Sequence, residues 1–504
     1  MVCGTTSDAG KSTVVTGICR LLARSGVSVA PFKGQNMSLN SVVTVEGAEI
    51  GRAQWIQAVA AGAEPEAAMN PVLLKPTSEH SSQVIVMGQP RQVEEAGDYQ
   101  RSKDELVGIV DGALEDLRSR FDVVICEGAG SPAEINLLDY DIVNLGLAQR
   151  AGISAVVVGD IHRGGVFAHL FGTVAILPGE LRSIVRGFII NMFRGDRELL
   201  GDAMEQLEAR CGVPTLGVLP YLTGLVLDAE DSLHRYLQDQ VVSPRLADVD
   251  QLDVVVLRFP RLSNFTDIDP LAIDTGLRVR FVDHPADFGN PDLVILPGTK
   301  STIADMSWLR SSGLLEIIEK GRQSASPPVL LGICGGFQMM GRGIADPEGV
   351  ESGESAVAGL GWLPVVTTFE TEKTTQLRHG TAFAHTWVHG YEIRHGRTVA
   401  VAGVGTSWGP WMALNDVGGD ALTSACDGDR LVFGTSLHGL FESDAFRESF
   451  LGLVGASRGK DWVPSGISFA DAREFQIDRV ADVCEMYLDT DALWRLIELG
   501  VRAQ

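Results

Sequence analysis

Residues 4–12 read Gly-Thr-Thr-Ser-Asp-Ala-Gly-Lys-Ser, and this stretch decides the fold of the amino-terminal half. A glycine-rich loop between a strand and a helix turns backbone N–H groups towards a phosphate, and the helix N-terminus adds its dipole. The predicted phosphate-binding residues are Gly4, Thr5, Asp8, Gly10, Lys11 and Ser12. Only residues 1–3 precede the loop, so we expect either a short first strand or a chain start further upstream.

The sequence around this loop alternates buried strands with amphipathic helices. Apolar runs at 27–32, 121–126, 153–159, 187–191 and 215–219 predict strands, and residues 11–25, 47–61, 103–118 and 197–211 predict helices. Uniformly apolar strands with helices between them indicate a parallel sheet covered on both faces.

Two charged residues follow strands of this sheet. Glu127 comes directly after the run at 121–126, where a carboxylate can bind Mg²⁺ directly or through water. Ser12 offers a hydroxyl to the same ion. Lys33 ends the strand at 27–32, and we expect it near the terminal phosphate. A solvated glutamate or lysine at a turn is the alternative in each case.

A second motif lies at 328–343, where the sequence reads PVLLGICGGFQMMGRG. An apolar strand runs into Gly332-x-Cys334-x-Gly336, which is the nucleophile-elbow pattern with cysteine in place of serine. The sharp turn exposes the sulfur, and the following helix N-terminus favours the thiolate. The backbone N–H of Gly335 is placed to stabilise an oxyanion. The alternative is a structural buried cysteine, which the flanking glycines make a poor explanation.

The predicted base for Cys334 is His438, which ends the strand-like run at 431–437. Another apolar run, 293–298, ends at Gly298, whose backbone we expect to supply the second oxyanion donor. Other strands of this half are expected at 252–257, 277–282, 292–296 and 329–333, and strand-like segments after 359 predict an antiparallel extension. Histidines also gather at 379, 385, 389 and 395, but their spacing does not fit a zinc motif.

The bulk composition excludes several classes of protein. The net charge of −24 disfavours nucleic acid and anionic membranes as partners. The seven scattered cysteines form no C-x-x-C pair, so we expect a reducing cytoplasm rather than a disulfide framework. No apolar run is long enough to span a bilayer, and the N-terminus does not look like a signal peptide. The sequence predicts no particular oligomeric state.

Longer strings carry a specific resemblance. The amino-terminal half resembles the dethiobiotin synthetase group of P-loop enzymes, and the carboxyl-terminal half looks like a class I, triad-type glutamine amidotransferase. Fused in this order, the two halves resemble the cobyric acid synthase family over almost the whole chain. The matching segments are residues 31–41 (PFKGQNMSLNS), 49–54, 69–76, 82–86, 127–136 (EGAGSPAEIN), 163–167, 193–196 and 390–393.

The resemblance implies the chemistry. Glutamine would be hydrolysed through a thioester at Cys334, and ATP with Mg²⁺ would activate four peripheral carboxylates (b, d, e, g) of the corrinoid adenosylcobyrinic acid a,c-diamide as acyl phosphates. Ammonia would then convert each to an amide. The resemblance also implies that Asn191 faces the adenine and that Glu46 has a metal role.

The chain departs from the family pattern at a few positions. Triad glutaminases usually carry glutamate two residues after the histidine, where this chain has Leu440, and Glu442 lies four residues on. The third member of the triad is therefore open. His162 stands where relatives tend to have aspartate, and Met192 where they tend to have lysine.

We therefore expect two doubly wound, mainly parallel α/β domains, the first P-loop NTPase-like and the second class I glutaminase-like. The expected boundaries are a synthetase domain at 1–227, a linker at 228–250, a glutaminase domain at 251–445 and a helical tail at 446–504. Three alternatives stay open: a cobyrinic acid a,c-diamide synthase, a cell-wall precursor amidating enzyme, and a nucleotide-gated scaffold with an inactive glutaminase domain.

Overall fold

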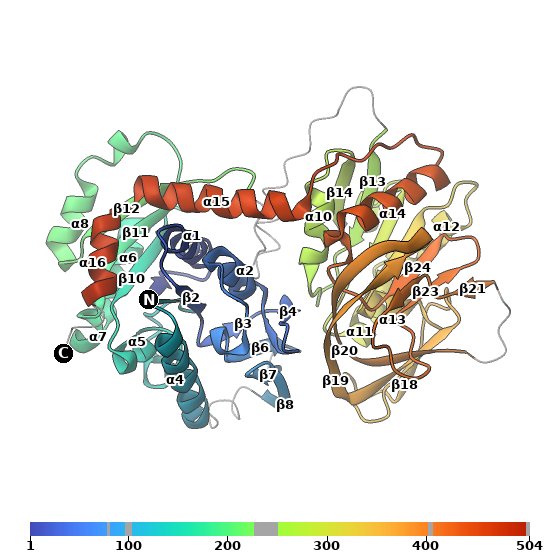
Figure 1. The fold of residues 1–504 in the computed structure, drawn as a ribbon, viewed down its shortest axis with the longest axis horizontal. Coiled ribbons are helices and arrows are strands. Elements are labelled where there is room, and N and C mark those ends of the chain that lie inside the picture. The colour runs from blue at the N-terminus through green and yellow to red at the C-terminus, as the bar shows by residue number, and fades with distance from the viewer. Residues whose placement is uncertain (78–80, 96–102, 226–249, 402–406, 500–504) are drawn as a thin grey trace. The chain divides into compact units, whose positions relative to one another are not determined.

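The computed structural model describes residues 1–77, 81–95, 103–225, 250–401 and 407–499, and the chain divides into two compact units (Figure 1). Unit 1 comprises Met1–Ser38, Ala48–Ser232 and Arg473–Gln504. Unit 2 comprises Leu39–Gly47 and Leu233–Ala472. The chain therefore passes from one unit to the other more often than a simple two-half division predicts.

The main sheet of unit 1 is parallel, as predicted. Its strands run in the order β1-β10-β11-β12, and a parallel bridge between Val2 and Glu127 connects β1 with the pair β2–β9. All six residues of β10 are buried, as expected for a strand with helices on both faces. The strands are β1 (Val2–Gly4), β2 (Val29–Phe32), β9 (Val123–Cys126), β10 (Ala155–Asp160), β11 (Val185–Phe193) and β12 (Thr215–Pro220).

The helices of unit 1 follow the predicted pattern with two differences. They are α1 (Lys11–Arg24), α2 (Arg52–Ala61), α4 (Lys103–Arg120), α5 (Leu145–Ala151), α6 (Val166–Ile176), α7 (Gly179–Arg182) and α8 (Ala203–Cys211). The helix expected at 47–61 begins only at Arg52, because residues 49–51 form the short strand β5 (Glu49–Gly51). The helix expected at 197–211 is interrupted at Gly201, which has a φ of 52°.

Unit 1 also contains a second sheet that we did not predict. Its order is β3-β6-β7-β8, with β6–β7 and β7–β8 antiparallel. The strands are β3 (Gln35–Met37), β6 (Val72–Pro76), β7 (Ser81–Val86) and β8 (Gln89–Glu95). Several of the strings that carry the family resemblance lie in this sheet.

Unit 2 has a seven-stranded sheet in the order β14-β13-β15-β16-β24-β23-β21. The first five strands are parallel and the last two are antiparallel. They are β13 (Leu252–Leu257), β14 (Leu277–Val282), β15 (Leu293–Leu296), β16 (Val329–Ile333), β21 (Trp408–Gly409), β23 (Ser424–Asp427) and β24 (Val432–Thr435). The α/β class predicted for both halves is thus confirmed.

The antiparallel extension expected after residue 359 is present. The long strands β19 (Val365–Ala382) and β20 (Thr386–Ala400) pair from Val365↔Ala400 to Ala382↔Thr386. The strands β17 (Gly343–Ala345), β18 (Ala356–Ala358) and β22 (Met412–Leu414) complete this sheet. Before residue 343, the helices of unit 2 are α10 (Asp269–Ala272), α11 (Thr302–Ser311), α12 (Leu314–Arg322) and α13 (Gly335–Met340).

The residues predicted as a tail are helical but belong to both units. They form α14 (Asp444–Ser457), α15 (Phe469–Tyr487) and α16 (Thr490–Leu499), and the division between units falls within α15, before Arg473. In unit 1, α15 packs closely on α1, because a Cβ on Gly17 would lie 2.5 Å from Cys484 Sγ. The predicted linker, 228–250, lies outside the described residues apart from Asp250. Within the described ranges, no helix is both long and apolar enough to cross a bilayer.

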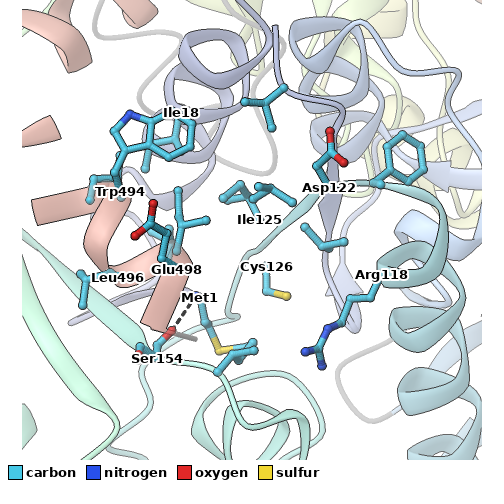
Figure 2. Close-up of a pocket in the computed structure, with 18 of the residues that line it drawn as sticks. Met1, Ile18, Arg118, Asp122, Ile125, Cys126, Ser154, Trp494, Leu496 and Glu498 are labelled. Atoms are coloured by element: carbon cyan, nitrogen blue, oxygen red, sulfur yellow. Dashed lines mark hydrogen bonds between the residues drawn. The ribbon is translucent and has the colours of Figure 1, made fainter. Parts of the chain in front are cut away.

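A pocket of about 680 Å³ lies within unit 1, at the amino ends of β1, β9 and β10 (Figure 2). Apolar residues of β9 and α16 line it, and the Met1 amino group donates a hydrogen bond to the Ser154 carbonyl at 2.8 Å. The P-loop and Glu127 follow the carboxyl ends of their strands, so this pocket lies at the other edge of the sheet.

Candidate active sites

The glycine-rich loop has the geometry of a phosphate-binding loop. It leaves β1 and enters α1 at Gly10, whose φ of 89° lies in the left-handed region. A Cβ on Gly10 would lie only 2.2 Å from Asn191 Nδ2, so both the conformation and the space require glycine. At the start of the loop, Thr5 N donates to the Val158 carbonyl at 2.9 Å. Among the described residues, the buried Thr5 hydroxyl finds no hydrogen-bond partner.

Lys11 lies against the loop that it follows. Its ammonium donates to the carbonyls of Thr6 at 3.0 Å, Ser7 at 3.1 Å and Gly130 at 3.3 Å. A Cβ on Gly4 would lie 3.0 Å from the Lys11 side chain, so Gly4 leaves room for it. The Lys11 ammonium is therefore held against the carbonyls of the loop that we expect to bind phosphate.

Glu127 joins three of the side chains around the loop. Its Oε1 accepts hydrogen bonds from Ser12 Oγ at 2.8 Å and from Lys33 Nζ at 2.9 Å. Its Oε2 accepts a hydrogen bond from Gln57 Nε2, and Gln57 is a residue that the sequence analysis did not single out. The structure thus brings the predicted residues Ser12, Lys33 and Glu127 together, with Lys33 and Glu127 buried and Ser12 half-buried. Its hydroxyl and carboxylate oxygens are ligands that Mg²⁺ prefers.

Asn191 and Asp8 have partners in the protein itself. Asn191 donates from Nδ2 to the Ala9 carbonyl at 3.0 Å and accepts at Oδ1 from Met192 N at 2.8 Å. These bonds tie Asn191 to the loop, and its expected contact with adenine stays a prediction. Asp8 forms an ion pair with Arg163 at 3.1 Å.

Glu46 belongs to unit 2, whereas Ser12 and Glu127 belong to unit 1. It lies in an exposed turn, closed by a hydrogen bond from Gly47 N to the Thr44 carbonyl at 2.9 Å. The metal role of Glu46 stays a prediction.

Cys334 occupies the sharp turn that the sequence predicts. It caps α13 with φ 50° and ψ −105°, a backbone conformation that a non-glycine residue rarely adopts. A Cβ on Gly332 would lie 2.7 Å from Gly336 C, and one on Gly336 would lie 1.9 Å from the Leu296 carbonyl oxygen. The flanking glycines therefore make the turn possible, as in other nucleophile elbows.

His438 lies beside Cys334 and is held by a carboxylate. Its Nδ1 lies 2.7 Å from Asp267 Oδ2, and Asp267 Oδ1 accepts a hydrogen bond from Gly439 N, also at 2.7 Å. Burial would lower the pKa of His438, but the interactions with Asp267 and Cys334 outweigh it and raise that pKa to about 10. The arrangement favours a thiolate–imidazolium pair oriented by Asp267.

The segment Gly390–Ile393 supports this pair from β20. Tyr391 and His438 exchange backbone hydrogen bonds of 3.1 and 2.8 Å, and their rings stack with centroids 5.4 Å apart. The Cys334 thiol lies 3.7 Å from the Ile393 carbonyl oxygen. Other histidines of the predicted group have local partners: His379 stacks on Trp387, and His389 Nδ1 lies 2.9 Å from Ser443 Oγ.

The two predicted oxyanion donors, Gly298 and Gly335, lie close together, because Gly335 approaches the residue that follows Gly298. A Cβ on Gly298 would lie 2.9 Å from His438 Cε1, and one on Gly335 would lie 3.2 Å from Thr299 N. The loop that follows Gly298 is held by Asp305, whose Oδ2 accepts hydrogen bonds from the Thr299 hydroxyl and from Arg261 N. Burial raises the pKa of Asp305 to about 6.

Each half of the chain matches a known protein family. Residues 1–233 match a CobQ/CobB/MinD/ParA nucleotide binding domain, and residues 253–446 match a CobB/CobQ-like glutamine amidotransferase domain. A cobyric acid synthase of Streptomyces avermitilis is 51% identical over 99% of this chain and 96% of its own. One of Frankia casuarinae is 48% identical over 100% of this chain and 97% of its own.

This chain belongs to the cobyric acid synthase family. A solved glutamine amidotransferase aligns with 40% of this chain and 98% of its own at 19% identity, with a TM-score of 0.31.

Sequence reasoning missed a polar cluster beside the elbow of this family member. Thr302 Oγ1 lies 3.2 Å from Gln338 Oε1 and 3.1 Å from Glu351 Oε1. A Cβ on Gly335 would lie 3.3 Å from that hydroxyl, so the cluster adjoins the residue after Cys334. Burial raises the pKa of Glu351 to about 7, although the charge of Lys300 opposes the shift.

The loop that carries Glu351 is fixed by a buried aspartate. The Asp346 carboxylate accepts hydrogen bonds from the backbone N–H groups of Val350 at 2.7 Å, Glu351 at 3.0 Å and Ser352 at 2.8 Å. Glu351 is therefore held in one position beside the elbow. A Gly-x-Cys motif gives no information about a residue that reaches the site from a separate loop.

Proposed function

We propose that this chain is an ATP- and glutamine-dependent amide synthetase that converts adenosylcobyrinic acid a,c-diamide to adenosylcobyric acid in cobalamin biosynthesis. Two features support the proposal together: the whole chain matches relatives named cobyric acid synthase, and it contains both a phosphate-binding loop and a Cys334–His438–Asp267 constellation. The expected domains at 1–227 and 251–445 would carry the two reactions. We place the enzyme in the cytoplasm, where ATP and glutamine are supplied.

The glutaminase reaction would use the pair in unit 2. The Cys334 thiolate attacks the side-chain amide carbon of glutamine, and the N–H groups near Gly298 and Gly335 stabilise the oxyanion. His438 gives its proton to the departing nitrogen, so ammonia leaves and a thioester forms. Water then attacks the thioester with His438 as base, and glutamate and the thiolate are released.

The synthetase reaction would use the loop in unit 1. A corrinoid carboxylate oxygen attacks the terminal phosphorus of ATP, ADP leaves, and an acyl phosphate forms. Ammonia then attacks the acyl carbon, inorganic phosphate is displaced, and the amide remains on the corrinoid. Lys11 and the N-terminus of α1 would balance the charge on the phosphates. Ser12 and Glu127 would hold Mg²⁺, which supplies further charge neutralisation when bound.

The reaction can be tested by following product mass and phosphate release together, with ATP, glutamine and the a,c-diamide as substrates. We expect successive products that each contain one more amide, up to four amidations, with one phosphate released per amide. Turnover of ATP and glutamine with an unchanged corrinoid would indicate that the enzyme amidates a different carboxylate substrate. Amidation of cobyrinic acid at positions a and c would identify the diamide synthase instead. No turnover of either ATP or glutamine would favour the scaffold.

We also propose that Glu351 binds the α-ammonium of glutamine, with Lys300 offering the opposite charge to the α-carboxylate. Free glutamine is a zwitterion, and Glu351 and Lys300 lie close enough for their charges to interact. Replacing Glu351 by Gln should raise KM for glutamine roughly 10- to 100-fold, the effect of one charge-assisted hydrogen bond. Because the pKa of Glu351 is about 7, the parent KM should fall as pH rises through 7.

The matched control for this prediction is Glu354→Gln, which changes an exposed residue of the same loop. The discriminating substrate is glutaric acid monoamide, which has the amide and a carboxylate but lacks the amino group. The parent should prefer glutamine over this compound, and Glu351→Gln should lose that preference. A preference unchanged in Glu351→Gln would mean that Glu351 only supports the start of α11, where it also lies 3.4 Å from Ile303 N.

A further inference from the structure

A short stretch of the amino-terminal half belongs to unit 2. Residues Leu39–Gly47, which contain β4 (Ser41–Val43), cluster with the glutaminase half, whereas the sequence on either side lies in unit 1. Its first three residues, 39–41, end the PFKGQNMSLNS string at 31–41. The stretch therefore belongs to unit 2 even though it is close in sequence to the phosphate-binding loop of unit 1.

Two reciprocal hydrogen bonds fix this stretch to the loop before α10. Phe265 N donates to Asn40 Oδ1 at 3.1 Å, and Ser41 N donates to Asn264 Oδ1 at 3.0 Å. All four residues are almost completely buried. A side-chain oxygen that accepts from a buried backbone N–H is costly to remove, because the N–H is left without a partner.

The loop that Asn40 holds is the one that carries Asp267. Asn264 has a φ of 51°, and Asp267 N donates to its carbonyl at 3.0 Å, which closes a tight turn. The N–H that Asn40 accepts belongs to the second residue of this turn. Asp267, which closes the turn, contacts both His438 Nδ1 and Gly439 N. A rotation of the turn would misdirect both carboxylate oxygens at once.

We infer that Asn40 is a positioning residue of the glutaminase: it fixes the turn that aims Asp267 at His438. The inference rests on the proposed function, since it assumes that His438 acts with Cys334 on glutamine. It means that the glutaminase site of unit 2 is completed by a residue encoded within the synthetase half. The string at 31–41 contains both Asn40 and Lys33, which holds Glu127 in unit 1, so one string of sequence supports both sites.

The inference can be tested in the full chain with Asn40→Ala. We expect kcat/KM for glutamine to fall on the order of 100-fold, the effect of a misplaced catalytic group. Ammonia-supported amidation should stay near the parent rate, because the phosphate loop and Glu127 are untouched. Asn40→Asp keeps an acceptor for Phe265 N and should recover most of the lost glutaminase rate. The control is Val45→Ala, since Val45 lies in the same stretch with 71% of its surface exposed.

A second readout separates positioning from loss of fold. Asp267, Cys334 and the ring of Tyr391 face His438, and of these Asp267 lies in the turn that accepts Asn40 as a partner at Phe265 N. The alkaline limb of the glutaminase pH profile should therefore move to lower pH in Asn40→Ala. An unchanged pH profile and glutaminase rate would overturn the inference. Equal losses of glutamine- and ammonia-supported activity would also overturn it, because they indicate general damage. A parent chain that hydrolyses no glutamine would instead refute the proposed function.

Discussion

Cys334→Ala should abolish glutamine-supported amidation while ammonia-supported amidation continues close to the parent rate. Removing the nucleophile of a covalent mechanism costs on the order of 10⁴-fold or more. The Cys334 side chain lies at the elbow of unit 2, whereas the phosphate-loop residues belong to unit 1. Glutamate release from glutamine and amide formation from added ammonium salt should be measured on the same protein sample.

The control for this prediction is Cys211→Ala, which removes a half-buried thiol at the end of α8. It should leave both activities unchanged. Glutamine hydrolysis that survives in Cys334→Ala would exclude a thioester at this residue. Loss of the ammonia-supported reaction as well would show that the two units fail together, and a denaturation midpoint would then distinguish misfolding from coupling.

The elbow and the phosphate loop were predictable because the residues that form each of them lie close together in sequence. Glycines at 332 and 336 are required by backbone contacts below 3 Å, and such requirements restrict sequence locally. The parallel strands were predictable for a similar reason, since strands buried on both faces must be apolar throughout. The sheet β3-β6-β7-β8 escaped prediction because its strands are short and partly polar.

Asp267 was not predictable from local pattern. It contacts His438 across 171 residues of sequence, and it lies in a short 3-10 helix without a motif. The usual position for the third member, two residues after the histidine, holds Leu440, which is buried in the core. Glu442 lies in the following 3-10 turn, whereas the Asp267 carboxylate makes both contacts with the 438–439 segment. The role of Asn40 escaped for the same reason, because the fold places it in unit 2.

Asp267→Asn should slow glutamine hydrolysis by up to about 10⁴-fold, the loss seen when an orienting aspartate becomes an amide in a catalytic triad. The amide can accept from His438 or from Gly439 N, but it carries no charge to stabilise the imidazolium. Asp267 is a main reason that the pKa of His438 is raised to about 10, so this pKa should fall in the variant. The alkaline limb of kcat/KM for glutamine should move to lower pH, and ammonia-supported amidation should be unaffected.

The ion pair between His438 and Asp267 should also make the stability of the folded protein depend on pH. A histidine whose pKa is raised on folding stabilises the folded state fully below its unfolded pKa, about 6.5, and loses that contribution as pH rises through the folded value. For His438 the loss should be complete only above about 10. The parent should therefore be more resistant to denaturant than Asp267→Asn at neutral pH, and the difference should shrink as pH approaches 10. A constant difference across this range, with an unchanged rate profile, would assign Asp267 to packing of the turn rather than to His438.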